Sequence, residues 1–323
     1  MKKQFKGLLL AVFGLTAMAG LASCSGSTEG FDTTKEITRY TRDTTSGTRE
    51  GFFEKIGFTE AQKDSTKIPG SVEVSGNGTM LSSIKGDEYG IGYASLASID
   101  SELKALSFEG VEATEENVVN GTYKLTRNFN YIIRTEEDMT ETEKALVKGF
   151  VLYMGSKEGL GIVVDNDGIL DASKSISSAE SWSDIIEKAE NADVKAACGA
   201  STKTTIYFGG STSVEKMSKA LTEAFAKVCT GFEASHNHTG SGDAYKRTQG
   251  SDKDSQNKLH IGFLSRDVKL SSGEPAAENT YGQICIDGIA VIVNKQNTAV
   301  NNLTAAQLKS IYATDHIRWN EIA

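Results

Sequence analysis

Three short segments rich in glycine, serine and threonine are the places where this sequence could bind a ligand. They read TSGT at 45–48, GGSTS at 209–213 and TGSG at 239–242, and each precedes a stretch with helical periodicity. The N-terminus of a helix presents unpaired N–H groups and a partial positive charge, so it can bind an oxyanion without a lysine. One such loop alone is usually a helix cap. Three of them together indicate an anion site.

Arg42 adds a cation to this set, because it lies four residues before Ser46. A guanidinium can bind two oxygens of an oxyanion at once. An arginine considered alone is more often part of a surface ion pair, and the nearby loop is what favours a role in binding. Thr212 and Glu215 have the spacing of a capping box, which predicts that Thr212 caps the helix after the second loop.

The motifs of several enzyme classes are absent. The sequence has no Walker loop, no Gly-x-Ser-x-Gly elbow and no zincin helix. His236 and His238 could place two imidazoles on one side of a strand, but no third ligand is evident. We therefore expect neither a metal nor a cofactor.

The charge balance argues against nucleic acid as a partner. The 323 residues include 34 Lys and Arg against 43 Asp and Glu, a net charge of −9, and such a protein repels a phosphate backbone. Charged residues at 24% and hydrophobic residues at 38% fit a soluble body large enough for two lobes.

The cysteines do not form a metal-binding pattern. Cys198, Cys229 and Cys285 match no metal spacing, and a chain of this length needs no disulfide in order to fold. We expect free buried thiols, with a bridge between Cys198 and Cys229 as the alternative.

The N-terminus predicts a lipoprotein. Residues 1–23 have three lysines and then an apolar run too short for a comfortable membrane span, as a lipoprotein signal peptide does. The run ends in LASC, similar to a bacterial lipobox, so Cys24 is the predicted lipidation site and 24–35 a polar tether. An ordinary secretory signal is the alternative. The predicted location is the extracytoplasmic face of the cell membrane.

Strand-like and helical stretches alternate along the rest of the chain, which predicts α/β lobes with largely parallel sheets. Residues 173–203 are rich in serine and alanine and are the predicted connector between two such series. The expected strands are 37–41, 71–75, 90–94, 129–135, 205–208, 260–263 and 284–293, and the expected helices begin at 48 or span 141–154, 214–228 and 304–312.

At the loops the sequence resembles the substrate-binding proteins of phosphate ABC transporters. The resemblance covers most of residues 36–172 and 204–323. Its motifs are RDTTSGTR at 42–49, IGYASL at 91–96, EGVEATEENV at 109–118, SKEG at 156–159, GSTS at 210–213, TGSG at 239–242, IGFLSR at 261–266, DGIAVIVN at 287–294 and the segment 302–323 that contains RWNEIA.

The order of these motifs is exchanged relative to the family. Residues 36–172 resemble the family's C-terminal half and residues 204–323 its N-terminal half, with 173–203 joining them. The resemblance thus implies a circularly permuted, two-lobed α/β periplasmic-binding-protein (Venus-flytrap) fold. One lobe would take roughly 130–172 with 204–285, and the other 36–129 with 286–323. The loops would still converge, because a permutation changes connectivity and not packing.

The resemblance also implies the ligand residues and one departure from the family pattern. Well-studied relatives carry an aspartate where Ser265 stands, although many relatives share the serine–arginine form, and this departure leaves discrimination against sulfate-like anions open. The implied phosphate-binding residues are Arg42, Ser46, Gly47, Thr48, Ser211, Thr212, Ser213, Ser241, Ser265 and Arg266.

The expected function is that of a lipid-anchored receptor that captures inorganic phosphate and delivers it to the permease subunits of an ABC importer. The alternatives are a receptor for sulfate, molybdate or tungstate, and a phosphate-sensing lipoprotein. A phosphoester hydrolase with Ser46 or Ser213 as nucleophile is a further alternative, but no histidine lies in these loops to act as base. We therefore expect no enzymatic activity.

Overall fold

The computed structural model describes residues 30–171 and 173–322. From Phe31 onward these residues form one compact unit, whereas the predicted signal peptide and Cys24 lie outside the described residues. No helix in the described part is long and apolar enough to cross a bilayer.

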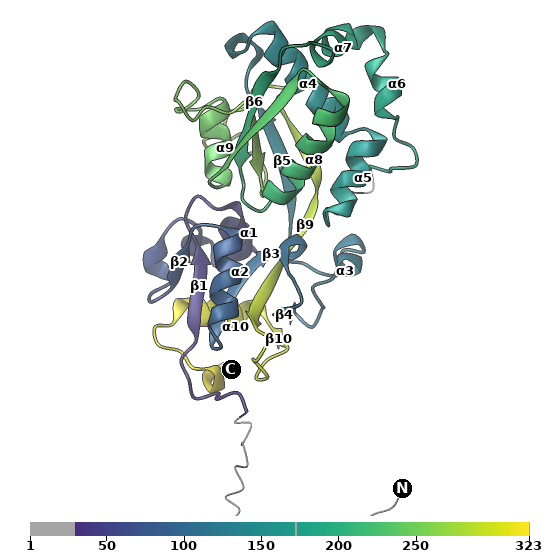
Figure 1. The fold of residues 1–323 in the computed structure, drawn as a ribbon. Coiled ribbons are helices and arrows are strands. Elements are labelled where there is room, and N and C mark those ends of the chain that lie inside the picture. The colour runs from purple at the N-terminus through teal and green to yellow at the C-terminus, as the bar shows by residue number, and fades with distance from the viewer. Residues whose placement is uncertain (1–29, 172, 323) are drawn as a thin grey trace, which may run out of the picture. The chain divides into compact units, whose positions relative to one another are not determined.

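The first lobe is built from both ends of the chain (Figure 1, purple to blue and yellow). Its core is aromatic: Phe52 stacks on Tyr93 with ring centroids 4.0 Å apart, and Tyr312 packs edge-on against Phe52. Its elements are β1 (Thr38–Arg42), α1 (Gly47–Lys55), β2 (Val72–Val74), α2 (Asn77–Gly86), β3 (Gly90–Ser95), β4 (Leu103–Phe108), α3 (Glu115–Val119), β10 (Asn302–Leu303) and α10 (Ala305–Ala313).

The second lobe comes from the middle of the chain (Figure 1, teal and green). Phe150, Phe208, Phe225 and Phe232 meet in its core and are almost completely buried. Its elements are α4 (Glu141–Met154), α5 (Lys157–Asp165), α6 (Trp182–Ile186), α7 (Ala192–Cys198), β6 (Thr204–Gly210), α8 (Glu215–Val228), β7 (Phe232–His238), α9 (Ser241–Thr248) and β8 (Ile261–Leu264).

Two long strands, β5 (Thr126–Ile133) and β9 (Tyr281–Asn294), link the lobes. β9 pairs with β3 and β4 of the first lobe, and β5 pairs with β8 of the second. The two strands are antiparallel to each other and to these neighbours, so the prediction of largely parallel sheets is correct only inside each lobe. Arg127 on β5 binds the Asp287 carboxylate on β9 through two nitrogens, at 2.9 and 2.8 Å, and both side chains are buried.

Local sequence signals explain the two longest helices. Apolar residues recur with a helical period along α4, and Thr140 with Glu143 forms a capping box at its start. The predicted span 141–154 is confirmed. The helix predicted at 214–228 is α8, which begins one residue later. Two cores joined by crossing strands confirm the two-lobed α/β fold.

The connector 173–203 is a packed part of the second lobe. Its helices α6 and α7 bury Trp182 and Val194 in that lobe's core. Cys198 at the end of α7 is bonded to Cys229 at the end of α8, so the expectation of free thiols was wrong for this pair. The reason is tertiary: Gly231 N donates to Cys198 O at 2.9 Å, which brings the two helix ends together. Cys285 is free and buried.

Candidate anion-binding site

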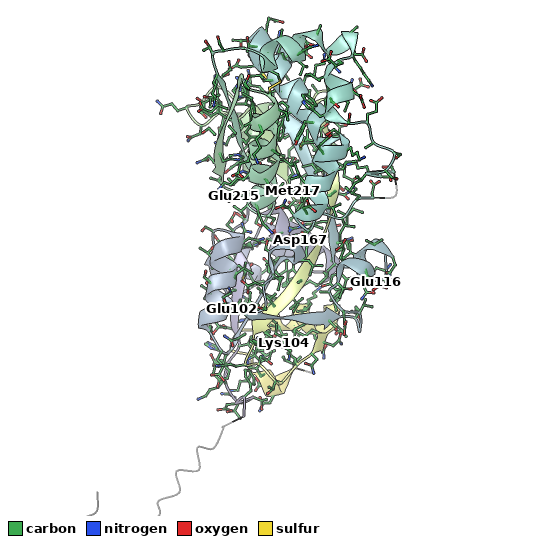
Figure 2. The ribbon with its side chains drawn as sticks, turned by 45° about the vertical axis from the view of Figure 1, so that its right-hand side comes forward. Glu102, Lys104, Glu116, Asp167, Glu215 and Met217 are labelled. Carbon is green, nitrogen blue, oxygen red and sulfur yellow. A yellow bond between two sulfur atoms is a disulfide. The ribbon has the colours of Figure 1, made fainter. Side chains whose placement is uncertain are left out.

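The three predicted loops meet, although they are far apart in the sequence. Thr48 Oγ1 lies 3.0 Å from Ser213 Oγ, and Gly242 N donates to Thr45 O at 2.9 Å. The loops precede α1, α8 and α9, so three helix N-termini point into one region between the lobes. Figure 2 shows Glu215 and Met217, in the first turn of α8, at the end of the second lobe that faces the first.

Close approach at this point requires a glycine. A Cβ atom on Gly47 would lie 2.6 Å from Ser241 Oγ and 2.8 Å from Ser265 Oγ, closer than such atoms can pack. The hydroxyls of Ser241 and Ser265 are 3.0 Å apart, and Ser265 N donates to Ser241 Oγ at 2.9 Å. The backbone of the first loop therefore fits directly against the third loop, 239–242, and against the end of β8.

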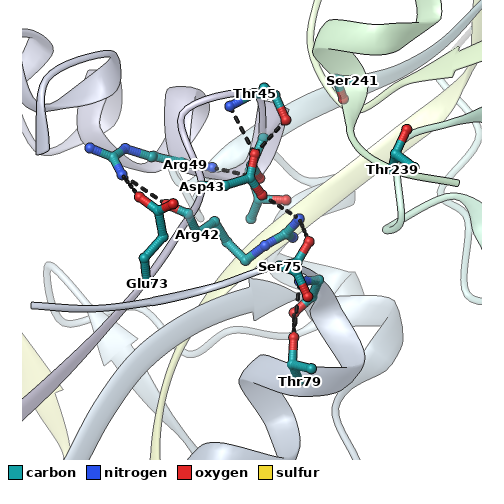
Figure 3. Close-up of polar contacts among 12 residues, drawn as sticks. Arg42, Asp43, Thr45, Arg49, Glu73, Ser75, Thr79, Thr239 and Ser241 are labelled. Atoms are coloured by element: carbon teal, nitrogen blue, oxygen red, sulfur yellow. Dashed lines mark hydrogen bonds and ion pairs between the residues drawn. The ribbon is translucent and has the colours of Figure 1, made fainter.

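Arg42 supplies the positive charge of the site. Its side chain is 1% exposed, and its Nη2 donates to Ser75 O at 3.1 Å, while Nε and Nη1 are buried without a hydrogen-bond partner in the described residues. Figure 3 shows the guanidinium between Ser75 and Asp43, with Ser241 and Thr239 of the other lobe across from it. A buried guanidinium with two unsatisfied nitrogens indicates an anion as the missing partner.

The surroundings of Arg42 hold it in place. Tyr93 accepts from Arg42 N at 3.2 Å, and the Arg42 carbonyl accepts from Arg49 Nη1 at 2.8 Å. Burial lowers the pKa of Arg42, and the neighbouring Asp43 carboxylate opposes that shift. Arginine keeps its charge in such an environment because its ordinary pKa lies far above neutral pH.

Asp43 is a site residue that the sequence analysis did not select. Its Oδ1 accepts from the amide and the hydroxyl of Thr45, which shapes the loop before α1. Its Oδ2 lies 3.5 Å from Arg42 Nη2 and is buried without a hydrogen bond in the described residues. The only signal in the sequence for a role of Asp43 was its position next to Arg42. That signal argued against a shared site, because adjacent residues in a strand normally point to opposite faces.

Thr212 does not cap α8, so that prediction was wrong. The helix begins at Glu215 with Val214 at the N-cap position, and no side chain caps it. Thr212 Oγ1 is buried and has no hydrogen-bond partner in the described residues. Because capping does not use this hydroxyl, it is available to a ligand.

The other predicted site residues divide into two groups. Ser46 caps α1 by accepting from Arg49 N at 3.3 Å, and Ser211 Oγ accepts from Ser213 N at 3.2 Å, so both side chains order the loops themselves. Arg266 is not brought to the loops' hydroxyls. Its guanidinium binds Glu274 through two nitrogens, at 2.8 and 2.5 Å, and lies 3.5 Å from Glu50.

Comparison with known proteins agrees with this fold. Residues 195–323 match the PBP superfamily domain. The chain is 29% identical over 328 residues to the phosphate-binding protein PstS 2 of Streptococcus agalactiae serotype V, with 100% of both chains covered. It is 28% identical to the phosphate-binding protein PstS 2 of Streptococcus pneumoniae serotype 4, with 99% of both covered.

A solved structure agrees as well. It is the phosphate-binding protein of a phosphate ABC transporter from Streptococcus pneumoniae TIGR4, at 25% identity and a TM-score of 0.62, and the match covers 90% of this chain and 100% of that one. These matches do not show an exchange of the two halves, which stays a prediction. The superfamily match, the full-length relatives and the shared two-lobed fold make this chain similar to the PstS-like periplasmic binding proteins.

Proposed function

We propose that this protein is an extracytoplasmic receptor that captures inorganic phosphate for an ABC importer. The observation that carries the proposal is Arg42, which is almost completely buried yet keeps two unsatisfied nitrogens beside the helix N-termini. The names of the relatives, phosphate-binding proteins and a phosphate ABC transporter protein, supply the identity of the anion.

Binding in this proposal combines one cation with neutral donors from both lobes. Arg42 binds two phosphate oxygens, and the N–H groups that begin α1, α8 and α9 bind the others together with the hydroxyls of Thr48 and Thr212. Closure of the lobes excludes water, which strengthens each of these contacts. Arg266 is left out of the proposed ligand set because Glu274 binds two of its guanidinium nitrogens and the Glu50 carboxylate lies 3.5 Å from the third.

Calorimetric titration of purified, phosphate-free protein with phosphate tests the proposal. We expect saturable one-site binding with heat released or absorbed well below millimolar phosphate. Absence of any heat at millimolar phosphate would contradict the function, whatever the fold.

One observation favours an oxyanion other than phosphate as the ligand. Ser265 is paired with Ser241 and offers no carboxylate to accept a phosphate proton. In the present structure the unsatisfied Oδ2 of Asp43 could accept it instead. Titration with sulfate, molybdate and tungstate separates the two cases. Preference for phosphate that is lost in Asp43→Asn identifies Asp43 as the acceptor, and tighter binding of another oxyanion makes that anion the ligand.

We also propose that the receptor is held at the membrane by a lipid on Cys24 and acts in binding and not in catalysis. The support is the lipobox-like LASC sequence and the absence of a histidine contact to the hydroxyls of Ser46 and Ser213 in the described residues. Cys24→Ala should move the protein from the membrane to the soluble fraction without changing phosphate affinity. Retention of that variant in the membrane would rule out the lipid.

The exchanged order of halves is part of the same proposal. Ile37 N donates to Ile317 O at 2.9 Å, so the start of β1 and the last turn of the chain are neighbours in one lobe, as Figure 1 also shows. That adjacency is what the proposed exchange requires, since it would allow the two segments to be joined directly. A chain in which residue 322 is linked to residue 36 and a new start is placed in 173–180 should fold and bind phosphate. Failure of this rejoined chain to fold would argue against the exchange.

A further inference from the structure

Two histidines form a hydrogen-bonded chain that ends on the second anion loop. His238 Nδ1 lies 3.0 Å from Ser211 O, and His238 Nε2 lies 3.2 Å from His236 Nδ1. His236 Nε2 in turn lies 2.9 Å from Thr222 Oγ1 on α8. We call these three side chains, Thr222, His236 and His238, the histidine relay.

Packing fixes the plane of both imidazole rings. His236 stacks on Phe208 with centroids 5.3 Å apart, and His238 stacks on Phe263 with centroids 6.2 Å apart. In the described residues no group of three or more His, Cys, Asp or Glu side chains could hold a metal, so the facing nitrogens are best satisfied by a shared N–H.

The carbonyl of Ser211 sets the direction of every hydrogen bond in the relay. A carbonyl only accepts, so His238 Nδ1 must carry a proton, and in a neutral ring His238 Nε2 then accepts. His236 Nδ1 must therefore donate, and His236 Nε2 accepts from the Thr222 hydroxyl. Thr222 Oγ1 is also 3.0 Å from Lys219 O, but donation there would leave two lone pairs facing each other.

Burial favours the neutral form of both rings. Burial lowers the pKa of His236 to about 4, with a further contribution from His238. Burial also lowers the pKa of His238, against a smaller opposing effect of its bond to Ser211 O. The charged groups that face the pair are Glu215 and Lys219 on α8 and Arg247 on α9.

The relay ends on the peptide unit between Ser211 and Thr212. Ser211 C=O and Thr212 N–H belong to one peptide unit, and hydrogen bonding at the carbonyl strengthens the N–H as a donor. No protein acceptor for Thr212 N is found in the described residues, and Thr212 Oγ1 is unsatisfied as well.

We propose that His238, supported by His236 and Thr222, is a positioning residue that orients and polarises the Ser211–Thr212 peptide towards the bound anion. The role deepens the proposed function and rests on it. This role requires that both imidazole rings carry their proton on Nδ1. The tautomer does not depend on the anion, so it can be measured in the phosphate-free protein.

Two substitutions at His238 separate hydrogen bonding from packing. Asn places an N–H close to the position of Nδ1, whereas Phe keeps a flat ring and removes the donor. We expect His238→Phe to weaken phosphate binding about three- to tenfold and His238→Asn to stay within about threefold of the parent. His316→Phe, an exposed histidine of the other lobe, is the matched control and should bind like the parent. Equal weakening by Phe and Asn, or no weakening by a folded Phe variant, overturns the proposal.

Nitrogen-15 NMR of the imidazoles tests the relay without phosphate. We expect both His236 and His238 to show the Nδ1–H tautomer between pH 6 and 8. An Nε2–H tautomer at His238 overturns the proposal, because Nδ1 could then not donate to Ser211 O. Because this NMR measurement uses the parent protein, it tests the relay even if His238→Phe fails to fold. If the parent shows the expected tautomers but binds no phosphate, the proposed function fails while the relay stands.

Discussion

In the proposed anion site the two lobes contribute different chemistry. The first lobe supplies the charge: Arg42 with Asp43 beside it, in front of α1. The second lobe supplies neutral donors, namely the hydroxyls of Thr212 and Ser241 and the N-termini of α8 and α9. Arg266, which follows Ser265, pairs with Glu274 and lies 3.5 Å from Glu50.

This difference indicates a division of labour in an acidic protein. Because the net charge is −9, the overall field opposes the approach of an anion, and one buried cation must offset it locally. The second lobe contributes directional hydrogen bonds to the anion but no second strong Coulomb attraction. It can therefore close on the bound anion and can also open again to release it. The predictions below test this division, beginning with the largest expected effect.

Removing the charge of the first lobe should have the largest effect. Arg42→Ala takes away one side of a desolvated, charge-assisted pair and should cost about 2–5 kcal/mol of phosphate binding. Arg42→Lys keeps the charge but loses the planar fork, so its loss should be intermediate. Calorimetry gives the affinities, and Arg318→Ala, an exposed arginine of the same lobe, is the control. Parent-like affinity in Arg42→Ala means that the charge of the site lies elsewhere.

Removing one neutral donor of the second lobe should have a smaller effect. Thr212→Val deletes a hydroxyl that is nearly isosteric with a methyl group and should cost about 1–2 kcal/mol of binding. Thr212→Ser keeps the hydroxyl and is the control. Combined with Arg42→Ala, the loss should be non-additive, because both groups act through one ligand and one closure. Strict additivity would mean that the two lobes bind independently.

The three loops of the candidate site could be predicted from the sequence because their signals are local. Glycine and hydroxyl residues at a helix start have the same meaning in any fold, and the loops at 45–48, 209–213 and 239–242 do meet. The span of α4 was predictable for the same reason, since its period and its capping box lie within one segment.

What could not be predicted depends on tertiary neighbours. The bond between Cys198 and Cys229 requires two helix ends to meet, and no spacing encodes that. Arg266 belongs to a motif that resembles a ligand segment, but its partner Glu274 lies in an irregular loop eight residues later. The capping box predicted for Thr212 and Glu215 does not form. The helix α8 begins at Glu215, so these two residues are not in register with its N-terminus.

A contact between the lobes should have a modest effect on closure. Glu50 of α1 lies 2.7 Å from Lys269 Nζ and 3.5 Å from Arg266 Nε, both of the second lobe. Glu50→Gln removes this link but keeps the hydrogen-bonding shape, so we expect about 0.5–1 kcal/mol weaker phosphate binding with a reduced salt dependence. Glu54→Gln, an exposed position on the same helix, is the control. Unchanged affinity and salt dependence would show that the ion pair does not contribute to closure.

The last expected effect concerns the stability of the protein and not its affinity for phosphate: an acid dependence of unfolding that arises in the second lobe. Burial lowers the pKa of His236 from an ordinary 6.5 to about 4, so between these values the unfolded chain binds more protons than the folded one. The free energy of unfolding must therefore fall as the pH falls from about 6.5 to about 4. Because His236 is only partly buried, its share should be about 1 kcal/mol. Urea unfolding at several pH values should show a flatter acid dependence in His236→Phe than in the parent. Equal slopes in the two proteins would mean that folding does not lower the pKa of His236.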